Sequence, residues 1–532
     1  MKTRNHNQNF LTRLRILSSK LAVSLLSGKA LHDASFAPFH QLAPLFTTIA
    51  EKGPRLLIGK GRFDHVLAVS PTSKRRELGN MLVVAPTRGG KGLLAISQLL
   101  TWPHSAIVND IKGELYEATA AYRKTLGSVF VLDPQGYGHQ YNPLAAYSAE
   151  DEFYSAATAL LHKPNEGDGA IFTLRAIDML TQLFLAAKME GLPPFPYIRQ
   201  LLHAGLVNTV ERLHALSSTF ATRFLDTTID RANFDDKFLL HSFGTLKAKL
   251  EPLLTERVLR SLSGSDFVPA HLLSSDKPIT IYLKWPERHL LALSPLIRLI
   301  WNSLIDELIL TYDTAKGKGC QPVLALIDEA GRTAIPTLAD HATTVVGRGI
   351  SLWIAAQDLS QLETVYGKAR AETLRNNMET QAFYRPADQK TAEYLERCLG
   401  RKSGFAHSET VREGEDVSEG RSEQAIPLLT AQHIKQLADE EIIAFHRNLP
   451  PIRATRLDWR DFPLLRARRS LAPPPVSPLP PLPDMLPSLA ATPEPAQVPF
   501  APVDPDELAG WRRSTTPIYT AGKAKKRDKS LA

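Results

Sequence analysis

A lysine that follows two glycines opens a predicted helix directly after a predicted strand. The segment LVVAPTRGGKG at 82–92 departs twice from the phosphate-binding pattern G-x-x-x-x-G-K-[ST], because Ala85 replaces the first glycine and Gly92 replaces the magnesium-binding hydroxyl. Adjacent glycines let backbone N–H groups curl around phosphate oxygens, and Lys91 is placed to reach the terminal phosphates. The segment is either a nucleotide site or an ordinary glycine-rich turn. The candidate nucleotide-binding residues are Pro86, Thr87, Arg88, Gly89, Gly90, Lys91, Gly92 and Asp110.

Two adjacent carboxylates end another apolar run, PVLALIDEAG at 322–331. In P-loop ATPases the first such acid holds Mg²⁺ through water, and the second polarises the attacking water. Asp328 and Glu329 fit these two roles, so the pattern predicts ATP and Mg²⁺ as nucleotide and metal. The alternative is a strand that merely ends in an Asp-Glu helix cap.

Further polar side chains follow two other predicted strands. The segment VNDIKGELYE at 108–117 puts Asp110, Lys112 and Glu114 just after a strand, where α/β sheets build their sites. Asp110 is alternatively a helix N-cap and nothing more. Gln357 ends the strand SLWIAAQ and is expected to sense the γ-phosphate.

Arg348 stands between two glycines, shortly before the strand that ends in Gln357. On a flexible turn it can serve as an arginine finger for a neighbouring subunit, since a guanidinium stays charged and is planar. The alternative is a surface salt bridge. The candidate catalytic residues are therefore Lys91, Glu329, Arg348 and Gln357, with Asp328 as the metal ligand.

Strand-like and helix-like runs alternate around these residues, which predicts a largely parallel α/β sheet. Helical patterns alone fill residues 151–262, so an all-helical insertion interrupts the α/β domain. The expected strands are 81–85, 105–110, 128–133, 278–286, 322–329, 351–357 and 380–386.

The composition is that of an ordinary soluble globular chain with two or three folded units. The 532 residues are 43% hydrophobic and 22% charged. The net charge of +8 favours an acidic partner such as nucleic acid or an anionic membrane surface. Cys320 and Cys398 are too few for a disulfide framework or a zinc site.

The two ends of the chain differ from its middle. Six basic residues and an apolar stripe precede the first acid, Asp33, which predicts a basic amphipathic helix for a membrane surface or for packing. No run is long and apolar enough to predict a transmembrane helix. From residue 471 the chain is rich in proline, which predicts a disordered tail, and its end is basic.

Several segments, taken in order, resemble the type IV coupling proteins, the TraG/TraD-like conjugation and secretion ATPases. They are the first block at 81–144, the return from the helical insertion at 264–286, LIDEAG, GRGISLWIAAQDLSQLETVYG at 347–367 and AFYRPADQKTAEYLERCLG at 382–400. The likeness covers roughly residues 35–460.

The resemblance implies a RecA-like P-loop motor domain in which the helical insertion is the family's all-α domain. Together with the disordered Pro-rich C-terminal tail, this is the expected α/β fold. It also implies a homo-hexamer that passes single-stranded DNA with its relaxase, or an effector protein, to a type IV secretion channel. Within the family the variant loop is normal. Lys91, Asp328 and Glu329 carry over onto the family's positions, and Gln357 does so less directly.

The chain departs from the family in one respect, because members usually begin with transmembrane helices. We therefore expect it in the bacterial cytoplasm or at the cytoplasmic face of the inner membrane, with peripheral or partner-mediated contact. The alternatives are a soluble FtsK/HerA-like pump for double-stranded DNA and a non-catalytic substrate-docking module. DNA-contacting residues are not assigned. The expected division is 1–60 basic N-terminal segment, 61–150 motor domain, 151–265 all-α domain, 266–470 motor domain and 471–532 tail.

Overall fold

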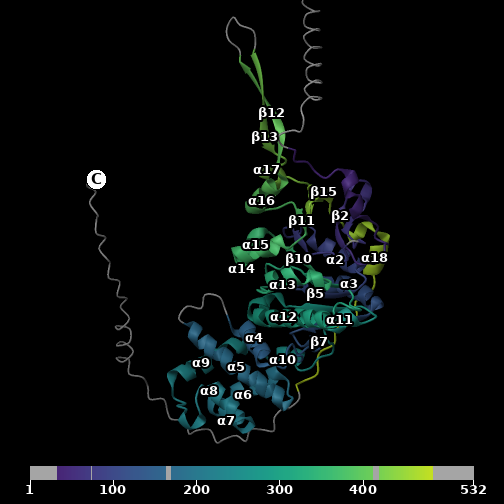
Figure 1. The fold of residues 1–532 in the computed structure, drawn as a ribbon. Helices are drawn as coiled ribbons and strands as arrows, with labels where there is room; N and C mark the ends of the chain where they lie inside the picture. The colour runs from purple at the N-terminus through teal and green to yellow at the C-terminus, as the bar shows by residue number, and fades with distance from the viewer. Residues whose placement is uncertain (1–32, 74, 163–168, 411–417, 483–532) are drawn as a thin grey trace, which may run out of the picture. The chain divides into compact units, whose positions relative to one another are not determined.

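A large β-sheet forms the centre of the protein (Figure 1). The structure is a computed structural model and describes residues 33–73, 75–162, 169–410 and 418–482. Within these ranges the main sheet has 13 strands in the order β1-β3-β2-β15-β14-β11-β4-β10-β9-β5-β8-β6-β7. A second sheet is the two-stranded hairpin of β12 (Arg401–Thr410) and β13 (Ser418–Pro427).

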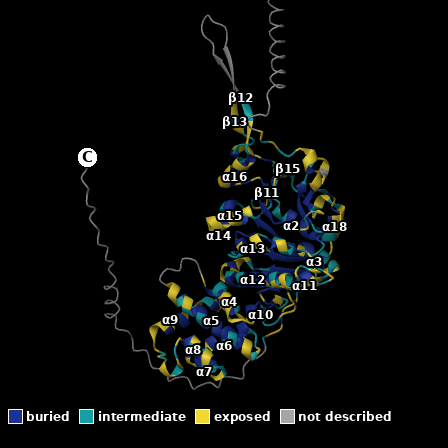
Figure 2. Ribbon diagram, viewed as in Figure 1, coloured by how far each residue is buried: buried dark blue, intermediate teal, exposed yellow. Residues whose placement is uncertain are grey.

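The middle of the main sheet is parallel, as the alternation of strand and helix patterns predicted. Its strands are buried on both faces, which explains why they are continuous apolar runs (Figure 2). All seven strands expected from the sequence are present. They are β11 (Thr380–Tyr384), β4 (Met81–Val84), β10 (Ile350–Ala356), β9 (Val323–Ile327), β5 (Ser105–Asp110), β8 (Ile279–Lys284) and β6 (Ser128–Asp133).

Antiparallel strands flank this parallel centre, and the sequence analysis missed them. Residues 46–60 belong to the sheet, so the body of the protein begins before residue 61, contrary to the expected division. The run Leu56–Lys60, buried except at Lys60, pairs with β3 and was not identified as a strand. These strands are β1 (Phe46–Thr47), β2 (Leu56–Lys60), β3 (Val66–Val69), β7 (Tyr137–Gly138), β14 (Glu441–His446) and β15 (Ile452–Thr455).

Helices cover the sheet and share its core. Met81 and Val83 alternate along β4 and join Leu94 and Leu99 of α2 (Lys91–Thr101) in one hydrophobic cluster. Two groups of helices pack among themselves. One group is α2, α3 (Glu114–Leu126) and α18 (Pro463–Arg469), and the other is α13 (Leu338–Thr344), α14 (Leu359–Tyr366), α15 (Lys368–Asn376), α16 (Gln389–Leu399) and α17 (Ala431–Lys435).

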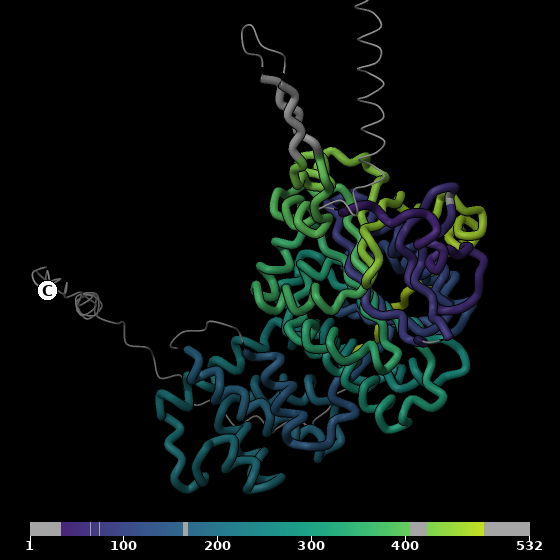
Figure 3. Tube along the Cα trace, turned by 45° about the horizontal axis from the view of Figure 1, so that its top comes forward, coloured from purple at the N-terminus to yellow at the C-terminus, as the bar shows by residue number. Residues whose placement is uncertain are grey.

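Between β7 and β8 the described residues contain helices and no strand, as the sequence predicted. Figures 1 and 3 show these helices gathered into a cluster, and the chain returns from it to β8 and then α12 (Leu290–Ala315). The members are α4 (Glu150–Leu161), α5 (Ala170–Glu190), α6 (Pro194–Ala204), α7 (Leu206–Leu216), α8 (Ser218–Leu225), α9 (Lys237–Leu250) and α10 (Glu256–Leu262), whereas α11 (His271–Ser274) contacts α12, β5 and β8.

Helix α5 is the one described helix that is long and apolar enough to cross a membrane, a candidate that the sequence analysis did not identify. Its most apolar window has a mean hydropathy of 1.4, and 61% of that window is buried within the protein. Helix α5 contacts α4, α6, α8 and α9, so its apolar surface forms the core of the helical cluster.

The first part of the Pro-rich tail is ordered, which corrects the expected start of the disordered tail at residue 471. The N–H of Gly138 donates to the carbonyl of Ser477 at 2.8 Å, and the N–H of Leu479 donates to Gly136 at 2.8 Å. Strand β7 lies at the sheet edge, where a proline-rich strand can pair through the groups that it retains. The N-terminal segment 1–32 and the tail from 483 lie outside the described residues.

Candidate active site

The glycine loop curls between the end of β4 and the start of α2. Arg88 and Gly90 have positive φ angles of 64° and 108°, and a side chain on Gly89 would come within 2.9 Å of the Pro86 carbonyl. The N-cap residue of α2 is Gly90, which has no side chain to accept a hydrogen bond at this end of the helix. The first N–H groups of a helix lack partners within it, so this end of α2 can receive an anion.

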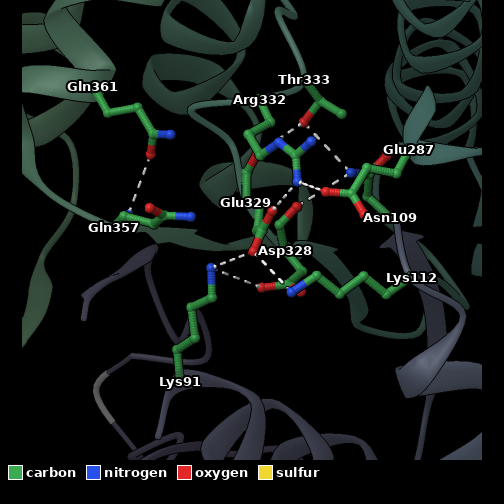
Figure 4. Close-up of polar contacts among 10 residues, drawn as sticks. All are labelled: Lys91, Asn109, Lys112, Glu287, Asp328, Glu329, Arg332, Thr333, Gln357 and Gln361. Atoms are coloured by element: carbon green, nitrogen blue, oxygen red, sulfur yellow. Dashed lines mark hydrogen bonds and ion pairs between the residues drawn. The ribbon is translucent and has the colours of Figure 1, made fainter. Parts of the chain in front are cut away.

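Lys91 brings this loop into contact with the two acids that follow β9. Its ammonium lies 2.9 Å from Glu329 Oε1 and 3.9 Å from Asp328 Oδ1 (Figure 4). The contact follows from the sheet, because β10 alone separates β4 from β9 and parallel strands end at one edge. Residues 238 positions apart in the sequence thus form one cluster.

Glu329 is the most constrained residue of the cluster. It is 3% exposed and has a φ of 58°, an unfavourable backbone conformation for a residue with a side chain. Burial raises the pKa of its carboxyl, but the hydrogen bond from Lys91 and the charges of Lys91 and Lys112 outweigh burial and hold the pKa below its usual value. Glu329 is therefore ionised and available to polarise a water molecule.

Asp328 has the properties of a cation ligand. Its Oδ1 atom is buried and has no hydrogen-bond partner among the described residues. Burial, with the charge of Glu329, raises the pKa of its carboxyl to about 6, although Lys91 acts in the opposite direction. A buried carboxylate oxygen with a free lone pair matches the hard oxygen donors that Mg²⁺ prefers, so the residues present fit this metal.

Asp110 and Gln357 lie at the same edge of the sheet but differ in what they can contact. The Asp110 carboxylate accepts the N–H groups of Gly113 and Tyr116, both at 2.8 Å, and so caps the start of α3. Burial raises its pKa to about 6, and both of its oxygens are engaged. The Gln357 side chain points toward the Lys91–Glu329 pair in Figure 4.

Arg348 is not brought to this cluster. It precedes β10, whereas Gln357 follows that strand, so Arg348 lies at the opposite edge of the sheet. Its guanidinium donates to both carboxylate oxygens of Asp313 at 2.8 Å and to the carbonyl of Thr344. The arginine of one chain therefore cannot serve that chain's own Lys91.

Three residues at the cluster were not identified from the sequence. Arg332 donates to Glu329 Oε2 at 3.2 Å and to Glu287. Arg456 lies beside Gly90 of the glycine loop. The position of Arg456 depends on β15, a strand that the sequence analysis missed. Arg332 follows the two acids closely in the sequence and could have been considered.

The third missed residue, Asn109, is completely buried beneath the acids. Its carbonyl oxygen accepts the indole N–H groups of Trp285 at 2.8 Å and Trp301 at 3.2 Å. Its amide then faces the carbonyl of Asp328 at 3.3 Å and the hydroxyl of Thr333 at 3.4 Å. Asn109 therefore connects the backbone of Asp328, the candidate metal ligand, to two tryptophans by hydrogen bonds.

Known proteins with similar sequences indicate a family for this chain. Residues 50–471 match the model of a family described as type IV secretory system conjugative DNA transfer. Protein VirD4 of Rhizobium radiobacter is 27% identical over 472 residues, which are 84% of this chain and 66% of that protein. Conjugal transfer protein TraG of Escherichia coli is 28% identical over 360 residues, which are 60% of this chain and 55% of the relative.

Solved structures share the fold. The bacterial conjugative coupling protein TrwBdeltaN70, in an unbound form, matches with a TM-score of 0.60 at 17% identity, over 81% of this chain and 93% of that one. The plasmid coupling protein TrwB in complex with ADP and Mg²⁺ matches with a TM-score of 0.54 at 19% identity, over 71% and 85%. The RecA-like P-loop fold expected from the sequence is confirmed.

Proposed function

Because the chain belongs to the family of type IV coupling proteins for conjugative DNA transfer, we propose that it is an ATP-driven motor of a type IV secretion or conjugation system. The observation that carries the proposal is the contact of Lys91 with Glu329 and Asp328 beside the open end of α2. The chain spans 55–66% of the length of the curated relatives named above, so its substrates and partners are part of the proposal.

Each residue of the cluster has a role in hydrolysis. The Lys91 ammonium leaves the acids and balances the charge of the β- and γ-phosphates, while loop N–H groups hold their oxygens. Glu329 then loses its nearest cation and can take up the proton of the attacking water. Gln357 senses the terminal phosphate. Arg332 keeps the Glu329 carboxylate in place through its second oxygen.

Asp328 would hold Mg²⁺ through water, and the ion would supply positive charge to offset that of the phosphates. A relative with this fold was solved with ADP and Mg²⁺ together. Gly92 offers no hydroxyl, which leaves Asp328 as the metal-binding side chain of the cluster.

The proposed substrate is relaxase-bound single-stranded DNA or an effector protein, and the partners are the components of the secretion channel. We propose a homo-hexamer that works in the bacterial cytoplasm or at the cytoplasmic face of the inner membrane, with peripheral or partner-mediated membrane contact. The family description, conjugative DNA transfer, supports a DNA substrate.

Two other functions remain as outcomes to be tested. A FtsK/HerA-like pump would prefer double-stranded DNA and need no relaxase, but the family match favours the coupling protein. A docking module would not hydrolyse ATP, and the paired Lys91, Asp328 and Glu329 argue against it.

Hydrolysis of ATP with and without single-stranded DNA tests the proposal. We expect DNA to stimulate turnover, and Lys91→Ala to abolish it without loss of folding, because Lys112 and Arg332 still contact the Glu329 carboxylate. Glu329→Gln should bind ATP but hydrolyse it at least about 100-fold more slowly. Lys124→Ala and Glu117→Gln, both exposed on α3, are matched controls. Full turnover in Lys91→Ala would exclude a nucleotide site here.

A further inference from the structure

Beside the active site lies a second cleft, of about 770 Å³, over the carboxyl ends of β5, β6 and β8. Lys112, Lys284 and Arg288 bring cationic groups to it from the ends of β5 and β8. Trp285, which is 1% exposed, forms part of its wall. None of the three cations belongs to the glycine loop, so this cleft is distinct from the proposed phosphate site.

The two acids of the cleft are already engaged. Asp133 lies 3.9 Å from the Lys284 ammonium and accepts the N–H of Gln135. Glu287 holds Arg332. Arg288 is exposed and makes no ion pair or hydrogen bond with any described residue. The positive charge left for a ligand is therefore mainly that of Arg288, because Lys284 is paired with Asp133 and Lys112 with Glu329.

An aromatic ring completes the cleft. Tyr137 belongs to the edge strand β7 and is 45% exposed, so its ring is accessible to a ligand. Exposed rings next to a basic groove are the arrangement on which the bases of single-stranded nucleic acid stack. The amino end of α3 also faces this region, but Asp110 already accepts its N–H groups.

We infer that this cleft binds the phosphodiester backbone of a single nucleic-acid strand, with one base stacked on Tyr137. This inference rests on the proposed function and gives it a DNA contact. Arg288 and Lys284 contact the phosphates. Lys112 lies on the boundary between the two sites, since its ammonium is 3.6 Å from Glu329 Oε1.

The same contacts connect the strand to hydrolysis. A phosphate at Lys112 competes with Glu329 for the ammonium and so leaves the carboxylate freer to act as a base. Glu287, on the rim of the cleft, holds Arg332, whose other contact is Glu329 Oε2. Binding of a nucleic-acid strand therefore changes the electrostatic environment of Glu329 through Lys112 and through Arg332.

Binding of fluorescein-labelled oligo(dT) to the full chain tests the site. Arg288→Glu should weaken binding at least about tenfold, and Arg288→Ala should weaken it several-fold. In the alanine variant, the slope of log affinity against log salt concentration should also fall in magnitude by about 1, because one phosphate contact is lost. Tyr137→Ala should weaken it by about tenfold. Lys277→Ala is the control, because Lys277 is exposed just before β8, at the opposite edge of the sheet. Unchanged affinity of Arg288→Glu and Tyr137→Ala would overturn the inference.

Two more measurements separate the causes of failure. If wild-type protein neither binds oligo(dT) nor hydrolyses ATP faster with it, the proposed function fails. If dTMP or inorganic phosphate displaces the oligonucleotide at equal phosphate concentration, the cleft binds single phosphates and the strand assignment is wrong. Glu287→Gln should keep oligonucleotide affinity but lower the stimulated-to-basal rate ratio, and an unchanged ratio would contradict the connection to Glu329.

Discussion

At the scale of single residues, the site depends on one ammonium that has two sets of possible partners. Lys91 contacts Glu329 and Asp328 now, and phosphate oxygens would compete for it. The present contact protects Glu329, because a carboxylate that is 3% exposed needs a cation to remain ionised. The same residue thus stabilises the acids and recruits the nucleotide.

Gly92 gives a prediction at this scale. A Cβ atom built on Gly92 meets nothing within 4 Å, so the structure has room for the hydroxyl that most phosphate loops carry. We expect Gly92→Ser to fold with a stability gain of roughly 0.5 kcal/mol, since glycine is unfavourable in a helix. The added hydroxyl is a new Mg²⁺ ligand, so the Mg²⁺ concentration for half-maximal hydrolysis should fall. Gly92→Ala is the control, and an equal fall with alanine would contradict the ligand role.

At the scale of elements, helix α12 connects the helical cluster with the active site. It packs on α4, and its Ser303 donates to the carbonyl of Pro143 and bonds Tyr141 at 2.8 Å. Two residues earlier, Trp301 donates to Asn109 beneath Asp328. A displacement of α12 would therefore reach the acids through two hydrogen bonds.

Tryptophan fluorescence tests this connection. We expect MgATP to change the emission of the protein, because Trp285 and Trp301 share the Asn109 oxygen. Trp301→Phe should remove a large part of that change and cost about 1 kcal/mol of stability for the lost hydrogen bond. Trp102→Phe is the control, since Trp102 is equally buried but bonds Ser105. An undiminished change in Trp301→Phe would show that Asn109 does not move.

A pH prediction belongs to the pairing of β11 with β14. His446 is 5% exposed and bonds the Thr380 hydroxyl at 2.9 Å, and burial followed by the charge of Arg447 lowers its pKa to about 4. In the unfolded chain the imidazole of His446 takes up a proton below about pH 6.5, whereas in the folded protein it does so only near pH 4. Protonation of the unfolded chain therefore lowers the stability of the fold as the pH falls from 6.5 to 4. The loss is at most about 3 kcal/mol.

The measurement compares wild type with His446→Asn, whose amide can still bond Thr380. Raised pKa values such as that of Asp110 act in the opposite direction, so only the difference between the two proteins isolates His446. We expect the wild type to lose more stability than the variant between pH 7 and 4.5. A constant difference across this range would assign the pH dependence to other groups.

At the scale of the whole molecule, the position of Arg348 has meaning only in an assembly. It lies at the sheet edge opposite to Lys91 and pairs with the exposed Asp313. In a ring, that edge can face the nucleotide site of a neighbour, where a guanidinium stabilises the transferring phosphoryl group. We keep the arginine finger as a proposal that assembly must test.

Mixing of inactive variants makes that test. Arg348→Ala should lower hydrolysis by about 10³-fold with little change in ATP affinity, as for other arginine fingers. Rings mixed from Arg348→Ala and Lys91→Ala subunits should recover some activity. Asp313→Ala separates the two interpretations, because it breaks the salt bridge but keeps the arginine. If Asp313→Ala is as inactive as Arg348→Ala, Arg348 acts through its salt bridge.

The sequence by itself determined the central strands, the helical insertion and the order of the motifs. Local patterns were sufficient there, since a strand buried on both faces is a continuous apolar run and a glycine loop before a helix is a short contiguous motif. Lys91, Asp328, Glu329 and Gln357 were found in this way, and the structure places all of them at one edge of the sheet.

Only the tertiary structure decided which residues meet. Asn109 and Arg456 look ordinary in the sequence, and they matter because strands far apart in the chain bring Asn109 to Asp328 and Arg456 to the glycine loop. The edge strands and residues 471–482 were missed for a related reason. Residues 471–482 are held by hydrogen bonds to β7, and β14 pairs with the distant β11, although β2 and β3 are neighbours in the sequence.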